Sequence, residues 1–193
     1  MSTPTIRLAT ASDAAAVAAI YAPYVRDTAI SFETTPPDTA TMARRIDHTL
    51  QRLPWLVGEI GGRIVGYAYA GELRQRPAYR WAVEVSVYVD LTARRTGLGR
   101  ELYRVLLDML AAQGHIQAFA GITLPNDASI GLHRTLGFAH VGTWHDVGFK
   151  LGRWHDISWW QRRLREPADT PADPLAPPGQ GCPVDQVTAP LGM

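Results

Sequence analysis

One segment, Glu84–Arg100, constrains the fold more than any other part of the chain. Its first residues are β-branched or aromatic at nearly every position from Val83 to Val89, which predicts a buried strand. A turn with two arginines and two glycines follows, and apolar residues then recur every three or four positions, which predicts a helix. Such a turn directs unpaired backbone N–H groups outward at the positive end of the helix dipole. It therefore favours an anion, and a phosphate fits best.

The spacing of the arginine and the glycines sharpens this expectation. Arg94, Gly97 and Gly99 form R-x-x-G-x-G, in which small residues allow a pyrophosphate to approach the main chain closely. A kinase-type P-loop is disfavoured because the sequence contains no G-x-x-x-x-G-K-[ST]. The pattern alone also fits an ordinary basic turn ended by glycines, so the choice depends on the rest of the chain.

The composition permits one catalytic domain and argues against several other classes of protein. A chain of 193 residues, of which 46% are hydrophobic and 19% charged, can bury a substantial core. The net charge of +1 argues against nucleic acid as a main partner. With Cys182 as the one cysteine, neither a disulfide nor a cysteine-based metal site is expected within the chain, and we expect no metal. No apolar run approaches ~18 residues and no signal-peptide core is seen, so we expect a cytoplasmic protein without a membrane partner.

Hydrophobic periodicity divides the rest of the chain into strands and helices. Gly61-Gly62 joins two apolar runs and predicts a hairpin. A strand at 83–89, the helix after it and a strand at 118–124 predict a right-handed parallel crossover. The further strands are expected at 5–8, 55–60, 63–70, 140–146 and 154–162, the further helices from Ser12, over 38–53 and over 128–136, and a loop at 148–152.

The C-terminal part differs from the rest in composition. Seven of the 27 residues from 167 to 193 are proline, with almost no aliphatic periodicity, which predicts an extended or disordered tail. We therefore expect one domain over 1–165 and a tail over 166–193. Cys182 lies in that tail, where no fixed base can lower the pKa of its thiol, so we expect no cysteine nucleophile.

Several separated motifs follow one another along the chain. They are W-x-x-E-x-S-V-Y-V (Trp81 to Val89), R-T-G-L-G (Arg95 to Gly99), L-P-N-D (Leu124 to Asp127), N-x-x-S-I-x-L-H-x-x-L-G-F (Asn126 to Phe138) and G-F-K-x-G-x-W-H-D (Gly148 to Asp156). In this order they resemble the GNAT superfamily of N-acetyltransferases, and they are similar to the motifs of its phosphinothricin and methionine sulfoximine N-acetyltransferase branch. The resemblance spans Thr5 to about Leu164 and implies an α/β fold with a mixed, centrally splayed sheet of about seven strands flanked by about four helices.

The resemblance implies acetyl-CoA as cosubstrate. In this superfamily the pyrophosphate lies on the glycine turn, and the pantetheine arm runs beside the central strand like an added strand. Asn126 would bind the pantetheine amide or the thioester, cap a helix, or do both. The residues implied to bind acetyl-CoA are Val87, Tyr88, Val89, Arg94, Arg95, Thr96, Gly97, Leu98, Gly99, Arg100 and Asn126.

Two residues are candidates for the proton transfers of acetylation. Attack on a thioester needs an unprotonated amine, so a base must take a proton, directly or through water. Glu84 is the expected base, because burial in an apolar strand raises the pKa of a carboxylate; the alternative is an ion pair with Arg76 or Arg80. By resemblance, His133 protonates the leaving CoA thiolate; the alternative is a capping or core histidine. Transfer is expected to be direct, in a ternary complex.

The resemblance also implies a binding site for an amino-acid-like acceptor. Arg76 would clamp a carboxylate, Arg74, Tyr79 and Tyr88 would complete an anion-binding pocket, and Phe32 would form its apolar wall. A solvated arginine-rich loop and a core phenylalanine are the alternatives. The implied acceptors are phosphinothricin, methionine sulfoximine or methionine sulfone.

Other functions and partners remain open at this stage. The domain could acetylate another small amine or a protein terminus, or bind acetyl-CoA as a non-catalytic regulatory module. The segment from Gly148 to Asp156 is expected to close the acceptor site, and a homodimer is the expected assembly.

Overall fold

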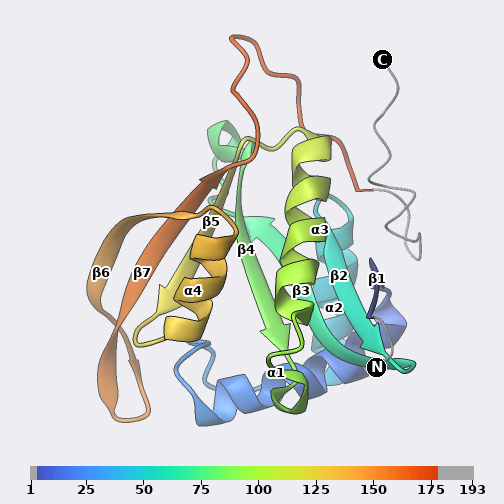
Figure 1. Ribbon diagram of the computed structural model, residues 1–193, viewed down its shortest axis with the longest axis vertical. Helices are drawn as coiled ribbons and strands as arrows, with labels where there is room; N and C mark the ends of the chain where they lie inside the picture. The colour runs from blue at the N-terminus through green and yellow to red at the C-terminus, as the bar shows by residue number, and fades with distance from the viewer. Residues whose placement is uncertain (1–3, 178–193) are drawn as a thin grey trace.

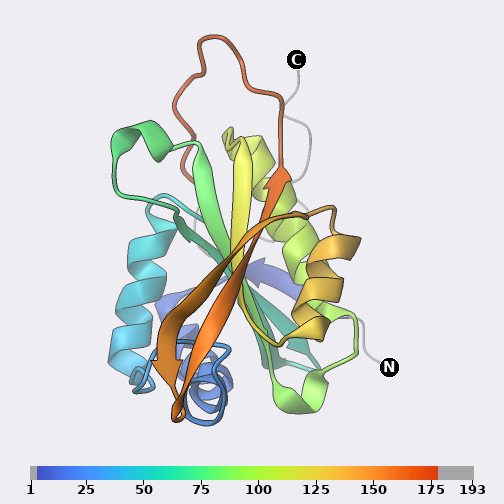
Figure 2. The same cartoon turned by 90° about the vertical axis from the view of Figure 1, so that its left-hand side faces the viewer.

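A computed structural model describes residues 4–177 as one open β-sheet with helices on both faces (Figures 1 and 2). The strands are β1 (Thr5–Leu8), β2 (Trp55–Ile60), β3 (Arg63–Glu72), β4 (Ala82–Val89), β5 (Gln117–Thr123), β6 (Ala139–Lys150) and β7 (Arg153–Arg163). The helices are α1 (Ala14–Asp27), α2 (Thr39–Leu50), α3 (Leu98–Gln113) and α4 (Asp127–Thr135), with short 3-10 turns η1 (Ala11–Asp13), η2 (Pro77–Tyr79) and η3 (Leu91–Ala93). Helices α1 and α2 cover one face of the sheet, and α3 and α4 cover the other.

The sheet is mixed, as expected. Its order is β1-β2-β3-β4-β5-β7-β6, and β4–β5 is the one parallel pair in the described chain. That pair is the predicted crossover through α3, and β2–β3 is the predicted hairpin. The expected fold class is therefore confirmed. None of the helices in residues 4–177 is both long and apolar enough to cross a membrane.

Three local predictions are corrected. Ser12 does not cap α1 but lies in η1, where Thr10 and Asp13 form the capping box. Helix α2 ends at Leu50, three residues earlier than expected. The expected loop at 148–152 is largely strand, because β6 runs to Lys150 and the turn to β7 needs only Leu151 and Gly152, both at positive φ.

The alternation of side chains along β4 decides which of them face α3 and which face α1 and α2. Val83 and Val85 belong to the core under α3. Tyr88 packs instead against the core under α1 and α2. Because side chains alternate along a strand, Glu84 and Ser86 share the face of Tyr88.

The sheet opens between β4 and β5 (Figure 2). These strands pair only at three positions, from Ala82–Gln117 to Glu84–Phe119, although both continue for several residues. Beyond Glu84 the edge of β4 is no longer covered by β5, which stays paired to β7 along its whole length. The predicted central splay is thus present, and it begins at Glu84.

The segment after β7 crosses the end of the sheet opposite the glycine turn (Figure 1). Residues 167–177 contain no helix or strand. Leu175 exchanges two backbone-directed hydrogen bonds with Gln113, and Arg80 forms an ion pair with Asp173 at 2.6 Å. The division into a domain over 1–165 and a tail over 166–193 stays a prediction, and Cys182 lies outside the described residues.

Candidate active site

The glycine turn presents the start of α3 without a side-chain cap. Gly97 is the N-cap residue, with a φ of 84° that favours glycine, and Arg95 also has a positive φ, of 63°. Gly97 has no side chain with which to cap the helix, and the hydroxyl of Thr96 accepts only from the amide of Leu98, at 3.5 Å, so the next amide, that of Gly99, remains available to an anion. Arg94, Arg95, Thr96 and Arg100 are exposed around it, as an anion site requires.

Two buried side chains, those of Leu98 and Tyr24, hold the glycine turn in place. Leu98 is 1% exposed and packs on Gly58 and Gly66, so it contributes only main chain to the turn. The guanidinium of Arg94 lies 5.5 Å from the ring centroid of Tyr24, whose hydroxyl donates to the carbonyl of Val89 at 2.6 Å. The turn and the end of β4 are therefore held together.

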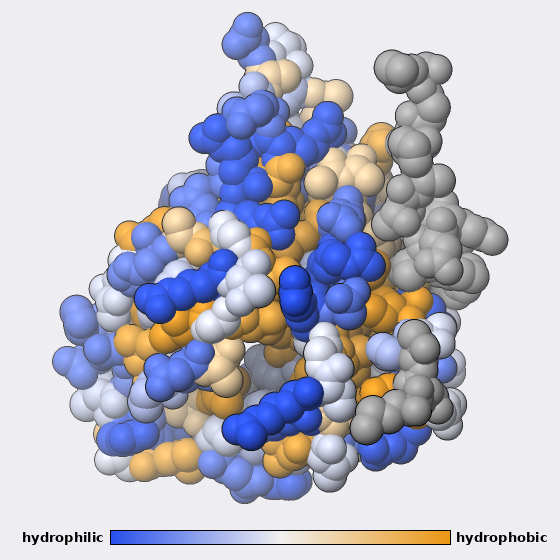
Figure 3. Space-filling view, in the orientation of Figure 1, coloured by the Kyte–Doolittle hydropathy of each residue, from blue (hydrophilic) through white to orange (hydrophobic). Residues whose placement is uncertain are grey.

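A cleft follows the open edge of β4 toward α4 and β5. It is lined by β4 residues from Val85 to Tyr88, by β5 and by α4, and Figure 3 shows this face hollowed between α3 and α4. The carbonyls of Val85 and Val89 point away from β3, because they accept hydroxyls of Tyr103 and Tyr24. Val87 has the same orientation, since alternate residues of a strand present their N–H and C=O to one edge. Its main chain is therefore available to an added strand-like ligand.

Glu84 lies where β4 and β5 separate. Burial raises the pKa of Glu84 above its ordinary value, and the nearby Arg74 acts in the opposite direction. In the described part of the chain Glu84 makes no ion pair, so the alternative of a partner at Arg76 or Arg80 is not what the structure shows. Glu84 pairs across the sheet with Gly71, where a Cβ would meet no atom within 4 Å. The carboxylate thus borders open space, which suits a general base.

His133 is buried in α4 beside the same cleft. Its Nδ1 lies 2.7 Å from the carbonyl oxygen of Ser129, so Nδ1 carries the proton. Its Nε2 is buried and has no partner among the described residues. Burial lowers the pKa of His133, which keeps the ring neutral at neutral pH. Nε2 therefore offers a lone pair, and proton donation from it would first require an imidazolium.

Asn126 caps helix α4, which is one of the two roles expected for it. Its side-chain oxygen accepts from the amide of Ser129 at 3.2 Å, which starts α4. The residue also lines the cleft, next to His133. A role toward acetyl-CoA is compatible with this position.

The expected acceptor residues do not form one pocket. Arg74, Arg76 and Tyr79 are exposed and line a cavity of about 370 Å³ that the segment after β7 helps to enclose. Phe32 lies elsewhere, over Gly148, where a Cβ would collide with its ring. Tyr88 packs in an aromatic cluster with its ring edge-on to Tyr21 and Tyr24.

Some residues near the site were not singled out from the sequence. Tyr103 and Tyr24 hold the carbonyls of β4, and Lys150 donates to the carbonyl of Ser31 at 2.6 Å, tying the β6–β7 hairpin to the loop after α1. Lys150 is only 7% exposed, and a lone lysine among the apolar residues of that hairpin was the available signal. Groups of His, Cys, Asp or Glu that could hold a metal ion are not found in residues 4–177.

Known proteins with similar sequences or folds agree with this geometry. The family profile described as acetyltransferase (GNAT) domain matches residues 6–159. A phosphinothricin N-acetyltransferase from Streptomyces viridochromogenes is 42% identical over 89% of this chain and 93% of its own. An L-methionine sulfoximine/L-methionine sulfone acetyltransferase from Salmonella typhimurium is 39% identical over 85% and 96%. A crystal structure of a phosphinothricin acetyltransferase from Sinorhizobium meliloti in complex with AcCoA has a TM-score of 0.83 and 37% identity, over 88% of this chain and 95% of that one.

These matches cover most of the chain and include the strands on both sides of the opening between β4 and β5. The cosubstrate is acetyl-CoA, for which the uncapped start of α3 and the free edge of β4 are the fitting parts of this chain. The enzyme is an acyl-CoA-dependent N-acetyltransferase. The chain belongs to the GNAT acetyltransferase family.

Proposed function

We propose that this enzyme transfers the acetyl group of acetyl-CoA to the α-amine of a small amino-acid analogue of the phosphinothricin, methionine sulfoximine or methionine sulfone type. The names of relatives at 42% and 39% identity support this class of acceptor. The observation that carries the proposal is the position of Glu84. It stands at the origin of the splay, with a raised pKa, beside the open space over Gly71.

The chemistry assigned to this chain is direct acetyl transfer. Glu84 accepts a proton from the acceptor's ammonium, directly or through one water, and the freed amine forms the new C–N bond to the acetyl carbon. The C–S bond breaks and the CoA thiolate leaves, to be protonated to the thiol. Amides at the start of α3 and at Val87 position the cosubstrate. A proton-donating role of His133 remains a proposal. Because the ring is neutral, its Nε2 would instead accept a hydrogen bond in the same cleft.

Glu84 and the arginines between Leu73 and Trp81 argue against the two alternative functions. A regulatory acetyl-CoA-binding module would have no need for a buried carboxylate at the splay, so Glu84 counts against it. An acetyltransferase of protein termini would need no side chain to clamp a free α-carboxylate, so the arginines between Leu73 and Trp81 favour a small acidic acceptor. The expected cytoplasmic location remains a prediction.

Replacing Arg76 by alanine is expected to raise the KM for carboxylate-bearing acceptors about 10- to 100-fold, since a charge-assisted hydrogen bond contributes roughly 1.5–3 kcal/mol. Arg76 has no carboxylate partner among the described residues, so its guanidinium is free to bind one. The measurement is CoA thiol release with amino-acid analogues and with the corresponding amines that lack the carboxylate. Arg104→Ala, on the exposed face of α3, is the control. An equal effect on both sets of acceptors would contradict the clamp.

We further propose a homodimer formed through the β6–β7 hairpin. Large apolar side chains gather on its exposed surface, and such patches mark interaction sites. The most exposed are Phe149, Leu151 and Trp154, each about 60% exposed. The hydrogen bond from Lys150 to the carbonyl of Ser31 ties this hairpin to the loop after α1.

Phe149→Arg together with Trp154→Arg is expected to convert a dimer into a monomer, because the interface would then bury positive charges from both protomers without partners. Sedimentation velocity at micromolar concentration measures the state of association. Leu91→Arg, which adds a charge to an exposed leucine far along the chain from the hairpin, should leave the dimer intact. A wild-type monomer would refute this assembly.

A further inference from the structure

Tyr24 joins helix α1 to the end of β4. Its ring belongs to the core between the sheet and α1 and is 6% exposed. Its hydroxyl donates to the carbonyl of Val89, the last residue of β4, at 2.6 Å. Figure 1 shows α1 at the end of the molecule where β4 runs into the glycine turn. The last turn of α1 is therefore fixed to the strand that leads into that turn.

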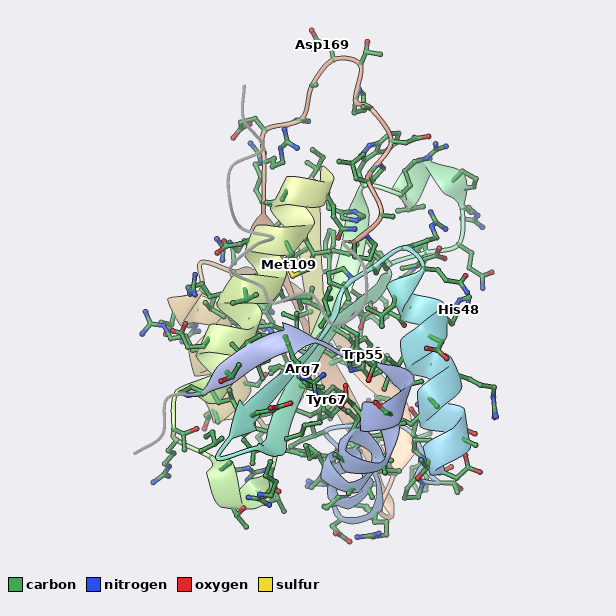
Figure 4. The ribbon with its side chains drawn as sticks, turned by 90° about the vertical axis from the view of Figure 1, so that its right-hand side faces the viewer. Arg7, His48, Trp55, Tyr67, Met109 and Asp169 are labelled. Carbon is green, nitrogen blue, oxygen red and sulfur yellow. The ribbon has the colours of Figure 1, made fainter. Side chains whose placement is uncertain are left out.

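Packing and capping fix the orientation of the Tyr24 ring. The ring meets that of Tyr88 edge-on, at 5.2 Å between centroids. Tyr88 in turn stacks on Tyr67 at 5.3 Å, and Figure 4 shows Tyr67 beside α1. The carbonyl of Tyr24 accepts from the hydroxyl of Thr28 at 2.7 Å, at the end of the helix. Because ring and backbone are both held, the hydroxyl of Tyr24 has a defined position.

Arg94 is oriented by the same hydroxyl. Its Nη2 donates to the Tyr24 oxygen at 3.4 Å, and its guanidinium carbon lies 5.5 Å from the ring centroid. Since the hydroxyl gives its one proton to Val89, its oxygen can accept from Arg94. Within residues 4–177, Arg94 has no carboxylate partner. Its positive charge is therefore held in place and remains available to an anion.

The other two arginines of the turn are not held in this way. Arg95 and Arg100 are exposed, and among the described residues neither side chain has a hydrogen-bond partner or lies over an aromatic ring. A free arginine loses side-chain entropy when it binds a phosphate, whereas one that is already oriented loses less. Arg94 is thus the preorganised cation of the glycine turn.

We infer that Tyr24 is a positioning residue for acetyl-CoA: its hydroxyl, anchored on the carbonyl of Val89, directs Arg94 toward the diphosphate. The hydrogen bonds run in series from Arg94 through Tyr24 to Val89, and each strengthens the next. This role is independent of the acceptor. It rests on the proposed function in one respect, because it requires the diphosphate to lie at the start of α3.

Tyr24→Phe removes the hydroxyl and keeps the ring. The Kd of CoA should rise about 3- to 10-fold, as for the loss of one hydrogen bond, whereas the Kd of pantetheine, which lacks the diphosphate, should stay within about twofold. The KM for acetyl-CoA should rise as well, with kcat within about twofold of wild type. Equilibrium titrations measure the two Kd values, and thiol release measures KM and kcat.

Tyr21→Phe is the matched control. Tyr21 also lies in α1 and also meets the ring of Tyr88 edge-on, at 4.9 Å. Its hydroxyl contacts Ser31 and Glu33 instead, at 2.6 and 3.0 Å, on the side of the loop after α1. This variant should leave the Kd of CoA and that of pantetheine within about twofold of wild type, because it removes no contact to Arg94.

A double-mutant cycle separates positioning from a general loss of structure. Arg94→Ala should raise the Kd of CoA about 10- to 100-fold, and adding Tyr24→Phe to it should raise the Kd by less than about twofold more. Effects that multiply would show that Tyr24 does not act through Arg94. Equal weakening of CoA and pantetheine by Tyr24→Phe would indicate disrupted packing, and tighter CoA binding would indicate that the hydroxyl competes with the cosubstrate. Each of these results overturns the role.

The same titrations distinguish a failure of this role from a failure of the proposed function. If wild type binds CoA no more tightly than pantetheine, the diphosphate does not lie on the glycine turn, and both are refuted. If Arg94→Ala removes the preference for CoA while Tyr24→Phe keeps it in full, the diphosphate site stands and the role of Tyr24 is refuted. If Tyr24→Phe gives the expected loss but no amino-acid analogue is acetylated, the role stands and the proposed acceptor class is wrong.

Discussion

Replacing Glu84 by glutamine lowers kcat about 10²- to 10⁴-fold, the usual contribution of a general base. Glutamine has nearly the same shape but cannot accept a proton from the amine. The affinity for CoA should stay within about twofold of wild type, because the proposed diphosphate site at the start of α3 is unchanged. Thiol release measures turnover, and calorimetric titration with CoA measures binding.

The pH profile gives an independent readout of the same residue. The base acts in its ionised form, so kcat/KM should fall as the pH drops through the pKa of Glu84, which burial raises above 4.5. Activity is thus lost at a higher pH than for an exposed glutamate. Glu72→Gln is the control, because Glu72 pairs across the sheet with Val83, on the face away from Glu84, and bonds Arg52. Retention of more than about a tenth of kcat in Glu84→Gln would rule out this base.

Leu98→Ala is expected to lower the free energy of unfolding by about 2–5 kcal/mol, the range for a fully buried leucine. Leu98 is 1% exposed and fills a space that two glycines leave in the sheet. A Cβ at Gly58 would lie 2.7 Å from its Cδ1, and one at Gly66 would lie 3.0 Å from its Cδ2. Since the backbone of two paired strands forms this space, it collapses little when the side chain is removed. Urea denaturation measures the change.

The same substitution should also weaken CoA binding, because Leu98 is the first residue of α3 and holds the glycine turn on the sheet. Leu91→Ala is the matched control: Leu91 is 48% exposed in the turn just before, and its loss should change stability by less than about 0.5 kcal/mol. Equal losses of stability in the two variants would show that Leu98 does not anchor the turn.

The parts of the fold that sequence could predict are those fixed by local patterns. The strand from Val83 to Val89, the glycine turn and α3 follow from residue spacing within a short stretch. The extension of β6 to Lys150 did not, because Gly148 is typical of a loop. Its actual reason is distant: the ring of Phe32 occupies the space that a side chain at 148 would need.

In the candidate site, too, local features could be predicted from the sequence and features set by distant contacts could not. Glu84 could be recognised because a carboxylate in an apolar strand is locally unusual. The separation of Phe32 from Arg76 depends on contacts between distant segments, since Phe32 packs over Gly148 whereas Arg76 lines a cavity with the segment after β7. For His133 the sequence named the residue but not its state, which is set by the carbonyl of Ser129 and by burial.

The short contact between β4 and β5 gives the molecule a mechanical property. Within the sheet, three residue pairs join the strands β1 to β4 to the strands β5 to β7, while the core under α3 contacts both groups. A cosubstrate lodged in the wedge bridges the two groups of strands, so its binding free energy also resists their separation. Filling the wedge therefore makes the enzyme stiffer at the place where it reacts.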